Sequence, residues 1–155
     1  MDNEELLKPT LSGYRQPPAL YNSTGFFLSA FIGGPVGAAI YGSANAWRLG
    51  RLSKDLPLFV GIAAFAFLVI LELDRQGVLG QLMAILGVRN GNFGIFLRGL
   101  GLACAGAIYF VHRGYFRAAT VSGVTPRPGW VPGIGALLAG VAANIAFVRW
   151  ILQHH

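Results

Sequence analysis

Long, nearly uncharged stretches alternate with short charged segments along this chain, and each stretch has the length of a membrane-crossing helix. The first, residues 25–47, runs 23 positions without a charge. About 20 helical residues, at about 1.5 Å each, cross the roughly 30 Å hydrocarbon core of a bilayer. Comparable stretches follow at residues 56–73, 93–112 and 132–152. The pattern predicts an all-α integral membrane protein with four transmembrane helices.

Two segments differ from this pattern. Residues 78–88 are apolar but too few to cross a bilayer, so they predict one short interfacial or re-entrant helix. Residues 1–24 are polar and contain three prolines, which predicts a largely irregular N-terminal tail. Residues 25–155 are then expected to form a single membrane domain.

Composition supports this fold class. Hydrophobic residues make up 54% of the 155 positions and charged residues 12%, about half the share that is usual in soluble domains. The 22 glycines suit membrane helices that pack closely through small residues. The net charge is +6, but the basic residues flank the apolar stretches. That position favours lipid headgroups and membrane topology as their role, and no nucleic-acid partner is predicted.

The loop charges predict an orientation. The loops after the first and third spans carry six basic residues, namely Arg48, Arg51, Lys54, Arg113, Arg117 and Arg127. The other side would carry five, namely Lys8, Arg15, Arg75, Arg89 and Arg149. Basic loops favour the cytoplasm, so a margin of one charge predicts both termini outside.

Small residues recur every four positions in three of the four spans, which places them on one helical face. They are Ser29, Gly33, Gly34, Gly37, Ala38 and Gly42 in the first span, Gly99, Ala103 and Ala107 in the third, and Gly135, Ala139 and Ala143 in the fourth. Such faces let helix backbones approach closely, so these residues are predicted helix-packing positions.

The first span also contains a candidate helix break. Pro35 cannot donate to the carbonyl of Phe31, and Gly33 and Gly34 weaken the helix further. Carbonyls freed in this way coordinate ions or substrates in some transporters. Asn144, near the middle of the fourth span, is the polar residue that would complete such a site, so Gly33, Gly34, Pro35 and Asn144 are candidate ligand or ion residues. The alternative interpretation is that Asn144 forms a hydrogen bond to the freed carbonyls.

The other polar residues indicate less about function. Arg98 is expected to pair with Glu72 or Asp74, which would tie the second span to the third. Cys104 is the only cysteine, and the three histidines lack the spacing of metal ligands. No catalytic residue, metal site or cofactor is predicted, because no nucleophile, base or ligand cluster falls at one membrane depth.

The segment FIGGP at residues 31–35, followed by Asn45 and by Leu49-Gly50, resembles a group of uncharacterised small bacterial polytopic membrane proteins with an F-x-G-G-P first span. The resemblance covers about residues 26–55. It implies a location in the bacterial inner membrane and transfers no activity.

Two functions fit these features. The first is a non-catalytic accessory or partner-binding subunit of a bacterial inner-membrane assembly, including an immunity or regulatory role. Its partners would be the lipid bilayer and another membrane protein or a second copy of the chain. The alternative is a small homo-oligomeric transporter or channel that uses the break at Gly33–Pro35.

Overall fold

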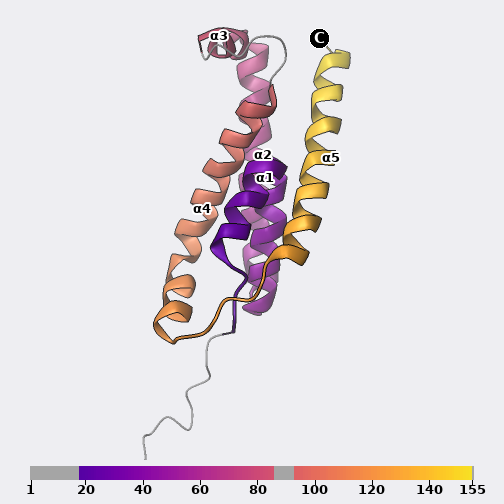
Figure 1. Ribbon diagram of the computed structural model, residues 1–155. Helices are drawn as coiled ribbons and strands as arrows, with labels where there is room; N and C mark the ends of the chain where they lie inside the picture. Colours follow the sequence, from indigo (N-terminus) through magenta and orange to yellow (C-terminus); the bar gives the residue numbers. More distant parts are fainter. Residues whose placement is uncertain (1–17, 86–92, 155) are drawn as a thin grey trace, which may run out of the picture.

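The computed structural model describes residues 18–85 and 93–154, and these residues form helices and no strand (Figure 1). The elements are α1 (Ser23–Arg48), α2 (Leu52–Arg75), α3 (Val78–Ile85), α4 (Phe93–Val121) and α5 (Trp130–His154). Four of them, all except α3, are long and apolar enough to cross a membrane. The predicted all-α membrane class, with four such helices and one short helix, is therefore confirmed. The predictions for residues 1–17 and 86–88 lie outside the described residues.

Helix α1 reverses direction at Gly34. This residue has φ 65° and ψ −155°, a left-handed conformation that glycine adopts without a steric penalty. Pro35 follows at the first position of the next helical segment, where a missing N–H costs little. Residues 23–33 and 35–48, here called the first and second arms, are therefore two helical segments joined at an apex.

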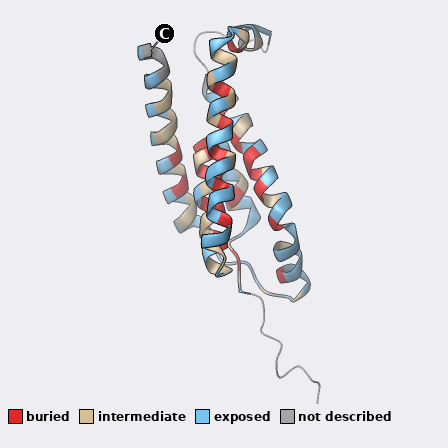
Figure 2. Ribbon diagram, turned by 180° about the vertical axis from the view of Figure 1, so that it is seen from behind, coloured by how far each residue is buried: buried red, intermediate tan, exposed pale blue. Residues whose placement is uncertain are grey.

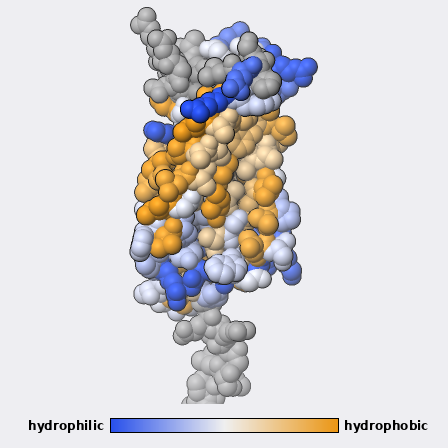
Figure 3. Space-filling view, turned by 90° about the vertical axis from the view of Figure 1, so that its right-hand side faces the viewer, coloured by the Kyte–Doolittle hydropathy of each residue, from blue (hydrophilic) through white to orange (hydrophobic). Residues whose placement is uncertain are grey.

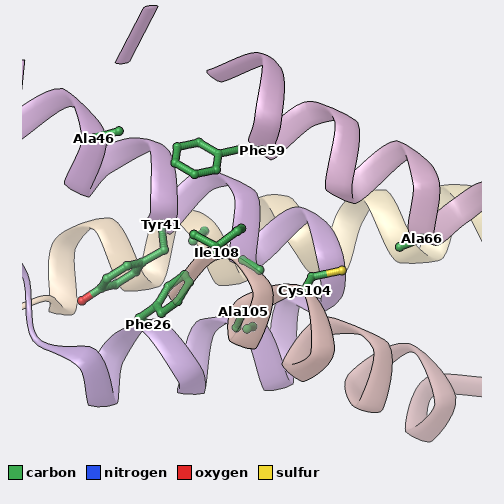
Figure 4. Packing of buried hydrophobic residues seen from close by; sticks show 11 residues of the cluster. Phe26, Tyr41, Ala46, Phe59, Ala66, Cys104, Ala105 and Ile108 are labelled. Carbon is green, nitrogen blue, oxygen red and sulfur yellow. The ribbon is translucent and has the colours of Figure 1, made fainter. Parts of the chain in front are cut away.

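Contacts between the arms show that they lie side by side. The rings of Phe26 and Tyr41 have centroids 5.6 Å apart, whereas a straight helix would separate these positions by about 22 Å (Figure 4). The backbone N–H of Tyr21 donates to Oδ1 of Asn45 at 2.8 Å, across the open end of the hairpin. Arms of 11 and 14 residues measure only about 16 and 21 Å. Helix α1 thus has the length and composition of a span but the path of a re-entrant hairpin.

The reversal decides which segments share an end of the bundle. The backbone N–H of Arg127 donates to the carbonyl of Leu20 at 2.8 Å, and Nε of Arg48 donates to the carbonyl of Ala19 at 2.7 Å. Residues 18–22, 49–51 and 122–129 therefore lie together, at what we call the base end. Helix α3 and the last turns of α5 lie at the opposite, far end (Figure 1). An apolar band separates the two ends, which are more hydrophilic (Figure 3).

This arrangement corrects the expected placement of the termini. The sequence predicted both termini on one side of the membrane, whereas the described ends of the chain lie at opposite ends of the bundle. The physical reason is the turn at Gly34, where the chain reverses and brings the start of α1 back beside its end.

The hairpin forms the centre of the core. Phe26 and Tyr41 from its two arms pack against Phe59 of α2 and against Ala105 and Ile108 of α4, all of them buried (Figure 4). Buried residues gather where the helices face one another, and much of the outward surface of α2 and α5 is exposed (Figure 2). A smaller buried cluster joins α2, α3 and α4 toward the far end, through Ile70, Leu79 and Leu97.

Candidate functional site

The apex of the hairpin is enclosed by glycines of two other helices. Gly140 of α5 lies so close to Gly33 that a Cβ added there would be 2.6 Å from the Gly33 Cα. Gly101 of α4 lies equally close to Gly34, and it also faces the carbonyl of Ala30. The two crossings are therefore contacts between backbones, with no side chain between them.

Asn144 completes this apex. Its Nδ2 donates to the carbonyl of Gly33 at 3.4 Å. Carbonyls at the end of the first arm have lost their helical partners, because the chain reverses at Gly34. One of them thus gains a donor from α5, as the hydrogen-bonding interpretation of Asn144 expected. Its Oδ1 is buried and has no hydrogen-bond partner within the described part of the chain.

The structure therefore brings together the four residues that were singled out as ligand or ion candidates. Gly33, Gly34 and Pro35 are buried at the apex, and Asn144 reaches them from α5. In this arrangement the Gly33 carbonyl contacts the Asn144 amide and the backbone of Gly140. Protein atoms from α5 therefore contact the Gly33 carbonyl at the apex.

The helix-packing predictions have different outcomes on different helices. All six positions of α1 are buried, namely Ser29, Gly33, Gly34, Gly37, Ala38 and Gly42. On α4, Gly99, Ala103 and Ala107 are exposed, and the buried face instead carries Gly101, Ala105 and Ile108. On α5, Gly135 and Ala139 are exposed and Ala143 is half-buried, whereas Ala136 and Gly140 are buried.

This difference has a simple physical reason. Both α4 and α5 carry small residues at four-residue spacing in two registers, such as Gly99–Ala103 and Gly101–Ala105. The spacing shows that a helical face consists of small residues. It does not show which of the two such faces meets α1. The contacts with Gly33 and Gly34 select the register of Gly101 on α4 and of Gly140 on α5.

The predicted ion pair of Arg98 is also corrected. The guanidinium of Arg98 lies over the ring of Phe31, 5.5 Å from its centroid. The carboxylate of Glu72 accepts a hydrogen bond from Nε2 of Gln76 at 2.7 Å. Within the described residues Arg98 thus pairs with an aromatic face on α1 rather than with Glu72 or Asp74 on α2.

A buried acid–imidazole pair is the polar feature that sequence reasoning missed. Nε2 of His112 lies 3.0 Å from Oδ2 of Asp55, and these residues are only 6% and 7% exposed. Nδ1 of His112 lies 3.1 Å from the carbonyl of Ile108. Both ring nitrogens face oxygen acceptors, and an imidazolium would satisfy both by donation. Arg51 adds a second contact to the carboxylate, with Nε 3.3 Å from Oδ2.

The pair connects α2 to α4 at the base end. Its members are 57 positions apart, so no local motif marks them. One signal could have found them, because the predicted topology already placed Asp55 and His112 at the same membrane face. Within the described residues, no group of three metal-binding side chains accompanies the pair. We therefore interpret it as a structural link.

A non-additive effect on stability is expected if this interpretation is right. Substitution of His112→Leu leaves Asp55 buried beside only the half-exposed Arg51, which should lower the free energy of unfolding by about 3 kcal/mol. The double variant Asp55→Leu/His112→Leu should lose less, since two apolar side chains can replace a buried ion pair at little cost. Equilibrium unfolding in mixed detergent micelles measures both. A double variant as unstable as the single one would contradict the interpretation.

Comparisons with known proteins add no constraint on function. No family model, curated protein or solved structure matches this chain. The resemblance over residues 26–55 accordingly stays a prediction.

Proposed function

We propose that this chain is a non-catalytic multi-pass protein of the bacterial inner membrane that binds another membrane protein as an accessory subunit. An immunity or regulatory role would be a form of the same activity. The observation that supports it best is an apolar groove of about 580 Å³ between α2 and α4. Its walls include Gly61 and Phe65 from α2, and Ala103, Cys104 and Ala107 from α4.

The groove exists because α2 and α4 meet mainly near their two ends. The Asp55–His112 pair joins them at the base end, and the cluster of Ile70 and Leu97 joins them toward the far end. Between these contacts, Gly61 and Ala103 leave space that no described side chain of the protein fills.

The chemistry of the groove fits a transmembrane helix of another polypeptide. Ala103 and Ala107 belong to the predicted packing face of α4, and the chain leaves this face exposed. Small residues allow a third helix to approach closely, while Phe65, which is 68% exposed, offers a large apolar contact at the rim. The groove runs alongside the middle of α2, so its occupant must itself be apolar and embedded in the membrane.

The orientation of the protein is part of this proposal. Among the described residues, the base end carries six basic residues, namely Arg48, Arg51, Lys54, Arg113, Arg117 and Arg127. The rest of the bundle carries three, namely Arg75, Arg98 and Arg149. This margin of three favours the base end in the cytoplasm and the end of α5 outside.

Filling the groove should release the partner. The protein is extracted gently from its own membrane and analysed by native mass spectrometry, with a different polypeptide expected at fixed stoichiometry. Phenylalanine at Ala103 and Ala107 should reduce retention of that polypeptide at least tenfold, because the bulky rings occupy the space of the incoming helix. Both positions are exposed, so the thermal stability of the protein itself should change little.

Ala139→Phe provides the matched control. Ala139 is also exposed but lies on α5, and it does not line the groove. Loss of the partner in this variant as well would mean that the groove is not the docking site. A complex that contains only copies of this chain would overturn the accessory-subunit proposal.

The alternative function is a small transporter or channel, and for it we expect such a homo-oligomer. The observation in its favour is the apex itself, where the hairpin turns inside the bundle and Oδ1 of Asn144 is buried without a hydrogen-bond partner among the described residues. Irregular backbone at membrane depth occurs where it is buried in protein or lines a cavity. The glycine contacts show that this apex is buried in protein rather than lining a cavity, so we place the transporter second.

A further inference from the structure

A second cavity, unrelated to the α2–α4 groove, opens at the base end and has a different chemistry. Its volume is about 830 Å³. It lies between the start of α1, the last turns of α4 and the segment that leads to α5. Its lining includes Ser23, Tyr109, Arg113, Arg117 and Thr120.

Three features of this cavity favour an anion. Arg113 and Arg117 are one helical turn apart and both line the cavity. The guanidinium of Arg113 lies over the ring of Phe110, 4.3 Å from its centroid. None of the described side chains that line it is acidic. Asn22 and Ser23, which also line it, begin α1, and Oδ1 of Asn22 accepts from the backbone N–H of Gly25. The helix dipole adds a partial positive charge at this end of α1. Forked guanidinium groups match the oxygens of a phosphate.

An apolar surface leads from this cavity toward the middle of the bundle. The ring of Tyr109 packs against Phe27 of the first arm, with centroids 5.7 Å apart, and against Phe116 at 5.2 Å. Phe31 lies one turn beyond Phe27 and is 41% exposed. A basic surface that can bind an anion therefore adjoins an apolar surface. A bilayer places its headgroups beside the first part of its acyl chains in the same way.

From this geometry we infer that the base-end cavity binds the phosphate headgroup of an anionic phospholipid. Arg113 and Arg117 bind the phosphate oxygens, and the hydroxyl groups of Ser23 and Thr120 lie within the same cavity. The acyl chains follow Phe27 along the seam between α1 and α4, toward the point where Arg98 lies over the ring of Phe31. Tyr109 lies where headgroup and chains meet, a position that aromatic residues favour in membranes.

Lipid titration followed by native mass spectrometry tests this site. The full chain is purified in detergent, stripped of lipid and titrated with phosphatidylglycerol or phosphatidylcholine. We expect phosphatidylglycerol to bind with the higher affinity. Its affinity should fall about tenfold in Arg113→Gln/Arg117→Gln, because both phosphate contacts are lost.

The control Arg127→Gln/Arg149→Gln removes the same number of charges, and neither residue lines the cavity. It should retain the preference and the affinity. An equal loss in both double variants would overturn the site in favour of general electrostatic attraction. Displacement of the lipid by millimolar glycerol phosphate would overturn the lipid assignment, since a free phosphate would then be the ligand. Melting temperatures close to that of the unchanged protein would show that both double variants are folded.

Discussion

Replacement of Gly140 by valine is expected to lower the melting temperature of the protein by about 10 °C, whereas Gly135→Val should leave it nearly unchanged. Both glycines are on α5, and both lie on small-residue faces of that helix. Only Gly140 contacts the hairpin, where a Cβ would be 2.6 Å from the Cα of Gly33. Nothing lies within 4 Å of a Cβ at Gly135.

The size of the effect follows from what the valine would meet. The atoms near Gly140 belong to the backbone of Gly33, so they cannot move aside as a flexible side chain would. Helix α5 must shift away from the apex, which also breaks the hydrogen bond from Asn144 to Gly33. Overpacking of this kind costs about 3 kcal/mol, which corresponds to about 10 °C for a chain of this length.

Scanning fluorimetry in detergent measures both variants through the protein's three tryptophans. The pair Gly101→Val and Gly99→Val repeats the test on α4, because only Gly101 contacts the apex. Equal melting temperatures for Gly140→Val and Gly135→Val would show that α5 does not pack on α1 through Gly140.

Local features of the sequence were sufficient to predict the helices. The length and apolarity of a span are properties of consecutive residues, so the four long helices and the short one could be predicted. The helix break could be predicted for the same reason, since Gly33, Gly34 and Pro35 are adjacent. The hydrogen bond from Asn144 to the freed carbonyls could also be predicted, because Asn144 lies near the middle of the fourth span and the break lies near the middle of the first.

The path of the chain after the break could not be predicted locally. A Gly-Gly-Pro segment permits a kink as well as a full reversal. The reversal is stabilised by distant groups, namely the backbones of Gly101 and Gly140 and the hydrogen bond from Tyr21 to Asn45. The Asp55–His112 pair was missed for a similar reason, because its two residues meet only after α2 and α4 have packed.

The hairpin also predicts which single cysteines react with a reagent that cannot cross the membrane, and this outcome is all-or-none. In a Cys104→Ala background, Pro18→Cys and Ser53→Cys are expected to react alike with a membrane-impermeant maleimide. These exposed positions flank α1. A straight helix of 26 residues would extend about 39 Å and place them on opposite sides of the membrane. A hairpin with its apex at Gly34 places both at the base end.

Two more positions report on the far end. Gln76 and Gln153 are exposed there, one after α2 and one near the end of α5. In intact bacterial cells, Gln76→Cys and Gln153→Cys should react with the reagent, whereas Pro18→Cys and Ser53→Cys should be protected. Permeabilised cells, in which all four should react, control for local accessibility.

The pattern of labelling separates the fold from the orientation. Identical behaviour of positions 18 and 53 tests the hairpin alone, whichever side they occupy. Opposite behaviour would contradict the reversal at Gly34 and restore a first span that crosses the membrane. If both pairs respond as expected but with the sides exchanged, the hairpin holds and the basic base end faces outward. The charge argument would then fail, while the lipid test at Arg113 and Arg117 would still stand, because it is done in detergent and depends on no membrane side.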